Sequence, residues 1–223
     1  LRFCVERHTD DGDDGRTIAQ LVQGASSREQ LYAQLVASAP TLESRKLRLQ
    51  VVSANGALET ESRWQVCSAL TLTEEMHNLC LSGAANGLKM VPWGGVAARI
   101  DQAQVKGVVF SFLPLPIETG LPVHVNGHFE VTPDRGRLWK IEDGLEGVAL
   151  VKARWNQFLA SEVISLCYCE VLTALAVPLE TALKQFFSVW PADGAQEPWI
   201  GMVTKLYHRL ALQPILPGPE SWL

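Results

Sequence analysis

The stretch that most constrains the fold of this chain is residues 107–140, GVVFSFLPLPIETGLPVHVNGHFEVTPDRGRLWK. Apolar side chains alternate along its first part, which predicts a strand because successive side chains point to opposite faces of a sheet. Pro114 and Pro116 are expected to end this strand, since proline lacks the backbone donor that a sheet uses. A turn at Gly120 then leads into a second strand that continues to Val131.

An arginine-bearing loop follows the second strand. Arg135 and Arg137 stand just before Trp139, and the pattern predicts that the loop feeds directly into a helix. Two fixed cations beside the start of a helix would suit a phosphate. They fit a solvated turn equally well, because Pro133 and Asp134 are typical turn residues. We expect Trp139 to be buried between the sheet and the helix, where it would anchor the loop.

Hydrophobic periodicity up to about residue 142 predicts strands of period two alternating with helices. The predicted strands include 46–52, 63–70, 96–100 and 108–113, and the predicted helices include 28–37 and one beginning at 73. Within the 63–70 strand, Trp64 and Val66 are expected to face the core.

The pattern changes from about Leu145, where apolar residues recur with the 3.6-residue period of an amphipathic helix. A last helix is expected to begin at Pro198. The predicted fold class is therefore α+β, a mixed β-sheet with covering helices followed by a C-terminal helical segment. We expect two parts: a mixed α/β subdomain at 1–142, and a helical segment at 143–223 that ends in a proline-rich linker.

The composition is that of a globular chain. Its 223 residues are 47% hydrophobic and 19% charged, and a chain of this length covers about 70% of its unfolded surface. The net charge of −5 argues against a general nucleic-acid binder. The sequence contains no apolar run of 18 residues, so we expect no membrane span. The five cysteines include no CxxC pair, which favours reduced thiols in a cytoplasmic protein. Because the chain begins at Leu1 without a signal-peptide pattern, we expect it to be a piece of a longer protein.

The sequence lacks the familiar motifs of nucleotide binding and hydrolysis. It contains no P-loop, no GxGxxG and no GxSxG nucleophile elbow. We therefore expect no cofactor in this chain and no enzymatic activity of its own.

Two groups of side chains contain residue types that can bind a metal ion. His124 and His128, with Glu130, would lie too far apart on a strand for one zinc ion, roughly 13 Å between the histidine Cα atoms. Structural histidines are therefore favoured. Residues 9–16 supply four aspartates, but the EF-hand register is missing, so a solvated loop is favoured over a calcium site. No metal is expected.

The sequence closely resembles the sacsin repeat family over roughly residues 63–175. The resemblance rests on the segments FLPLP (112–116), ETGLP (118–122), HVNGHF (124–129), Arg135 with Leu138-Trp139, PWGGVAA (92–98) and Trp155-Asn156. Repeats of this family usually carry two adjacent arginines before Asn-Leu-Trp. Here the order is Arg135-Gly136-Arg137-Leu138, so the resemblance leaves open which guanidinium acts.

The resemblance implies a position just downstream of a heat-shock-chaperone-like ATPase domain. ATP and Mg would bind to that domain and not to this chain. In the related ninety-kilodalton heat-shock chaperones, a middle-domain arginine reaches the terminal phosphate of the ATP, the chemistry of an arginine finger. Arg135, and as a second candidate Arg137, would take that role here. Implied partners are the upstream ATPase domain, client proteins and the heat-shock chaperone machinery.

The sequence is compatible with two alternative functions, one in a co-chaperone and one purely architectural. In the first, the chain is a non-catalytic middle-type segment of a co-chaperone repeat that couples an upstream ATPase to clients in protein quality control. In the second, it is an architectural spacer whose arginine loop touches no nucleotide. An ATPase assay with and without this chain separates the two.

Overall fold

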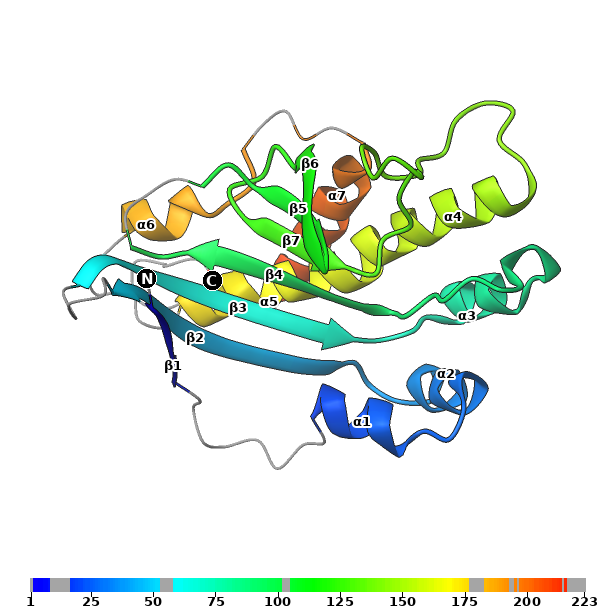
Figure 1. Cartoon of the computed structure of the whole chain (residues 1–223), viewed down its shortest axis with the longest axis horizontal. Helices are drawn as coiled ribbons and strands as arrows, with labels where there is room; N and C mark the ends of the chain where they lie inside the picture. The colour runs from blue at the N-terminus through cyan, green and yellow to red at the C-terminus, as the bar shows by residue number, and fades with distance from the viewer. Residues whose placement is uncertain are drawn as a thin grey trace.

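The computed structural model describes residues 2–8, 17–52, 58–101, 105–176, 183–192, 195, 197–213 and 215. These residues form a seven-stranded sheet in the order β1-β2-β3-β4-β7-β5-β6, flanked by helices (Figure 1). The strands are β1 (Arg2–His8), β2 (Thr41–Val52), β3 (Leu58–Leu70), β4 (Trp93–Arg99), β5 (Val108–Ser111), β6 (Leu113–Glu118) and β7 (His124–Gly127). Neighbouring strands are antiparallel except β5 and β7, which are parallel. The predicted α+β fold with a mixed sheet is confirmed.

The helices lie before, between and after the strands. They are α1 (Ile18–Gly24), α2 (Arg28–Val36), α3 (Glu74–Leu81), the 3-10 turn η1 (Gly83–Ala85), α4 (Gly147–Phe158), the π-helical turn η2 (Leu159–Ile164), α5 (Ser165–Ala176), α6 (Leu183–Ser188) and α7 (Trp199–Leu210). The side chains of Thr17, Ser27 and Thr73 accept hydrogen bonds at the starts of α1, α2 and α3. These caps explain where the three helices begin, because the first turn of a helix has unpaired N–H groups.

One face of the sheet is covered by the long helix, residues 147–176, formed by α4, η2 and α5 (Figure 1). On β3, the buried side chains that face this helix are Gln65, Cys67 and Ala69. Since side chains alternate along a strand, Trp64 and Val66 lie on the opposite face, where they are only half-buried. The expectation that Trp64 and Val66 face the covered core was therefore wrong.

A glycine in β4 lets the long helix approach the sheet closely. A Cβ atom at Gly94 would lie 2.6 Å from Cδ1 of Ile164, closer than packed atoms come. The thiol of Cys167, one turn further along, donates to the Gly94 carbonyl at 3.5 Å. Gly94 therefore has a packing role, because it lets α5 and η2 contact β4 closely.

The prolines of the 107–140 stretch lie inside a strand and do not end one. Pro114 and Pro116 belong to β6, which pairs with β5 and forms the edge of the sheet. An edge strand tolerates proline because one of its sides needs no hydrogen bonds. The chain reverses instead at Phe112, whose φ is +60°.

The helical segment after residue 142 shares one core with the sheet. The buried cluster runs from Leu31 to Ile215 and includes residues of both predicted parts. The division at 142/143 itself stays a prediction. The long helix is long and apolar enough to cross a membrane by length and composition alone, and 56% of its most apolar window is buried inside the described chain. The absence of a membrane span also stays a prediction, and the loop at 9–16 lies outside the described residues.

Candidate functional site

The arginine loop, residues 131–138, is closed by an antiparallel bridge between Val131 and Leu138. Inside it, the N–H of Thr132 donates to the Arg137 carbonyl at 2.9 Å, and the N–H of Arg135 donates to the Thr132 carbonyl at 2.8 Å. The carboxylate of Asp134 accepts from the Thr132 hydroxyl and from the Gly136 N–H. These two bonds lower the pKa of the Asp134 carboxyl. The loop therefore has one defined backbone path.

A buried asparagine fastens both arms of the loop to α4. Asn156 is 0% exposed. Its Oδ1 accepts from the N–H of Glu130 at 2.8 Å, and its Nδ2 donates to the carbonyls of Glu130 at 2.7 Å and Trp139 at 2.8 Å. The indole of Trp155, also 0% exposed, donates to the His128 carbonyl at 2.8 Å. One turn of α4 thus fixes the segment that enters the loop and the segment that leaves it.

Trp139 was expected to be the buried anchor, and the structure corrects this. Trp139 is only half-buried. The ammonium of Lys152 lies 6.0 Å from the centroid of its ring. Its Nε1 donates to the Val131 carbonyl at 3.1 Å. Trp139 therefore braces the loop from outside, while Trp155 and Asn156 hold it from the core.

Arg135 is engaged within the fold. Its φ of +55° puts it in the left-handed region, which is unfavourable for any residue with a Cβ atom. Its Nη2 donates to the carbonyl of Ser111 at 3.2 Å and so ties the loop to the end of β5. This guanidinium serves the junction of loop and sheet.

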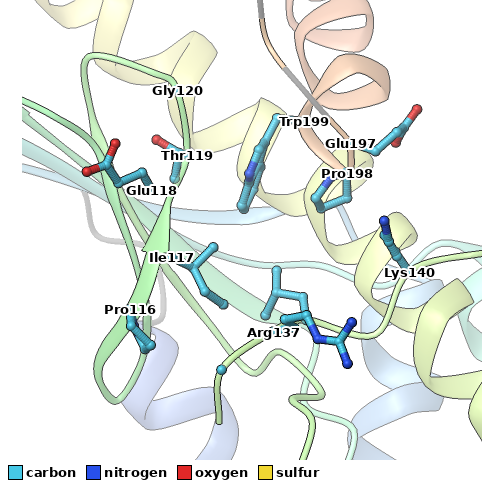
Figure 2. A pocket seen from close by; sticks show the side chains of 12 residues that line it. Pro116, Ile117, Glu118, Thr119, Gly120, Arg137, Lys140, Glu197, Pro198 and Trp199 are labelled. Carbon is cyan, nitrogen blue, oxygen red and sulfur yellow. The ribbon is translucent and has the colours of Figure 1, made fainter.

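Arg137 lines a cavity of about 480 Å³ between β6, the arginine loop and the start of α7 (Figure 2). Its guanidinium has no hydrogen bond and no ion pair to any part of the chain that the structure describes. Asp134 feels its charge only as a weak attraction. Of the two candidates, Arg137 is therefore the one whose donors are free for a ligand.

The lining of the cavity is mixed, with apolar side chains, two cations and two carboxylates. Ile117, Leu138 and Trp199 line it, and Lys140 stands on the same side as Arg137. Two carboxylates, those of Glu118 and Glu197, also belong to the lining residues but point away from its middle in Figure 2.

The expectation that the loop feeds directly into a helix was wrong. Residues 139–146 separate it from α4, which begins at Gly147. The N-terminus of α4 therefore adds nothing to the arginines, because a helix dipole acts only within about one turn of its end.

His124 and His128 lie within the sheet region, and His124 makes a hydrogen bond across neighbouring strands. Nδ1 of His124 accepts from the N–H of Val108 at 3.1 Å, and its ring stacks on Trp64. Burial lowers the pKa of both His124 and His128, as desolvation does to a cation. Among the described residues, no group of three or more His, Cys, Asp or Glu side chains could hold a metal ion.

Sequence reasoning missed Asn156 as a clamp and Trp199 as a cavity wall. The available signal for Asn156 was an amide among the apolar positions of the long helix, since a buried amide needs partners. For Trp199 no signal existed, because its partners in the cavity lie about 60 to 80 residues away along the chain.

No protein-family model matches the chain, and no solved structure matches it. The chain is 36% identical to human sacsin over 139 residues, a match that covers 57% of this chain and 3% of sacsin. It thus corresponds to a small fraction of the length of that relative. This identity agrees with the resemblance found in the motifs, and the chain therefore contains a sacsin-like region.

Proposed function

We propose that this chain is a non-catalytic middle-type segment of a sacsin-like co-chaperone repeat. It would present an arginine to the terminal phosphate of ATP held by an upstream ATPase domain. Through that contact it would couple hydrolysis to the handling of client proteins in protein quality control, in the cytoplasm. ATP and Mg would be bound by the upstream domain.

The observation that carries this proposal is the state of Arg137. A buried amide and a closed backbone bridge hold the backbone of the loop, and the exposed Arg137 guanidinium makes no hydrogen bond or ion pair with the described residues. Because the backbone is already in position, only the side chain of Arg137 must be ordered when a phosphate arrives, which limits the cost of placing its charge. Arg135, by contrast, uses one of its donors within the fold.

The two arginines then have different roles. Arg137 is the candidate for the phosphate contact, and Arg135 is a positioning residue that fixes the loop on β5. Sequence reasoning favoured Arg135 for the contact. The hydrogen bond from its guanidinium to Ser111 is the reason to prefer Arg137.

The test compares ATP turnover by the upstream ATPase domain alone with turnover by a polypeptide in which this chain follows that domain. We expect the longer polypeptide to hydrolyse ATP at least about tenfold faster, a modest part of what an arginine finger can supply. Equal rates would favour the architectural spacer.

A further inference from the structure

An apolar groove lies on the face of the sheet opposite the long helix, which passes behind β3 and β4 in Figure 1. The groove has a volume of about 360 Å³ and follows β4, where the small residues Gly95 and Ala97 form its floor. Trp64, Trp93 and Phe110 form its walls, and all three are only half-buried. Half-buried aromatic side chains around a floor of small residues are typical of a surface that binds a partner.

The groove carries no formal charge. None of the residues that line it is Asp, Glu, Lys or Arg. Arg45 and Arg99 lie on the same face of the sheet, and they form ion pairs with Glu43 and Asp101. Burial lowers the pKa of the imidazole of His124, the one histidine of the lining, and so favours its neutral form. The groove therefore suits an uncharged partner, because a buried charge would find no counter-ion there.

Two hydrogen-bond donors on β7 line the groove and have no acceptor among the described residues. Nδ1 of His124 accepts from the N–H of Val108, so the proton of the neutral imidazole is on Nε2, which is left free. Oδ1 of Asn126 accepts from the N–H of Phe112 at 3.4 Å, and its Nδ2 is left free in the same way. His124 and Asn126 are two residues apart on one strand, so their Cα atoms are about 6.8 Å apart.

The spacing of these donors equals the repeat of an extended polypeptide, in which the carbonyls on one side recur every second residue. We propose that the groove binds an extended apolar segment of another protein, whose side chains pack against the aromatic walls and whose backbone carbonyls accept from His124 and Asn126. A second copy of this face is a poorer match, because its groove also offers donors. The proposal is independent of Arg137 and of any nucleotide.

The experiment measures the binding of a fluorescent peptide to the whole chain by fluorescence anisotropy. The probe is a short uncharged peptide that alternates serine with leucine and phenylalanine, so that its apolar side chains share one face when it is extended. We expect saturable binding with a dissociation constant below about 100 µM. The same peptide with serine at every position is the control and should not bind. Absence of saturable binding by the apolar peptide would overturn the proposal.

Two variants test the two parts of the groove separately. Asn126→Asp keeps the acceptor for the Phe112 N–H but replaces the free donor with a carboxylate that repels a carbonyl. Ala97→Phe fills the floor of the groove. Each should weaken binding of the apolar peptide at least about tenfold. Asn78→Asp and Ala33→Phe, at exposed helix positions away from the groove lining, are the matched controls and should leave binding unchanged.

The remaining outcomes point to other occupants, and each would overturn the proposal. Binding that only Ala97→Phe weakens would indicate an apolar site that does not recognise a backbone, such as one for a lipid chain. Binding that only Asn126→Asp weakens, or that neither variant weakens, would place the peptide outside the groove. A concentration-dependent dimer in sedimentation velocity that Ala97→Phe dissociates would show that a second copy of the chain fills the groove.

Discussion

Two arginines separated by one glycine occupy different environments in this loop. Arg135 has a left-handed backbone and gives a hydrogen bond to Ser111, whereas Arg137 lines a cavity and its side chain makes no hydrogen bond or ion pair with the described residues. The strain at Arg135 is local, and it lies where the backbone turns to aim the next side chains. Strained residues of this kind are common beside functional groups.

The strain at Arg135 leads to a prediction about stability. Arg135→Ala and Arg135→Gly both lose the bond to Ser111, but only glycine adopts a positive φ without cost. We expect the glycine variant to be more stable than the alanine variant by about 1 kcal/mol, measured by urea unfolding. The same pair at Arg137, which has no positive φ, is the control and should show the opposite order. An alanine variant at 135 as stable as the glycine variant would show that the strain is absent.

At the scale of elements, the loop depends on a helix that follows it in the chain. Asn156 on α4 supplies three hydrogen bonds to the backbone on both sides of the loop. The position of the arginine loop therefore depends on its hydrogen bonds to α4.

Asn156→Ala should therefore cost about 2 kcal/mol or more of unfolding free energy. It leaves the Glu130 N–H and the Trp139 carbonyl without described partners at a site that is 0% exposed, and each such group costs about 1–3 kcal/mol, whereas the Glu130 carbonyl keeps the bond from the Trp139 N–H. Chemical denaturation measures the loss. Gln157→Ala, at the neighbouring exposed position, should change stability by less than about 0.5 kcal/mol. Equal effects of the two changes would rule out the clamp.

The sequence predicted the type of most described elements but not how they combine. Periodicity located β3 and the long helix, yet it could not tell which face of β3 is covered, because Trp64 and Val66 on the open face are as apolar as Cys67 and Ala69 on the other. Pro114 and Pro116 read as strand breakers because edge position is a property of the whole sheet.

The candidate site was predicted only in part, for a related reason. Arg135 and Arg137 were identified from the motif, but their different roles depend on long-range contacts. The carbonyl that engages Arg135 lies 24 residues away in the chain. The wall that faces Arg137 comes from β6 and from the start of α7. Spacing along the sequence carries no information about such contacts.

Across the described residues, the molecule is a sheet covered by helices on one face, and a cavity lined by Arg137 lies at its β6 edge. Neither its motifs nor its described cavities provide a phosphate cradle with a base-holding site. Isothermal titration of the isolated chain with Mg-ATP should therefore show no measurable binding. A micromolar dissociation constant would contradict the view that the nucleotide belongs to another domain.

The most direct measurement of the central claim is steady-state ATP hydrolysis by a polypeptide that carries the ATPase domain followed by this chain, with Arg137→Ala and Arg135→Ala compared. A guanidinium that acts on the developing phosphoryl charge contributes to the transition state more than to the ground state. We predict that Arg137→Ala lowers kcat about tenfold or more and leaves ATP affinity nearly unchanged, while Arg135→Ala has a smaller effect that follows its loss of stability. Unaltered kcat in both variants would contradict the account and leave this chain an architectural spacer.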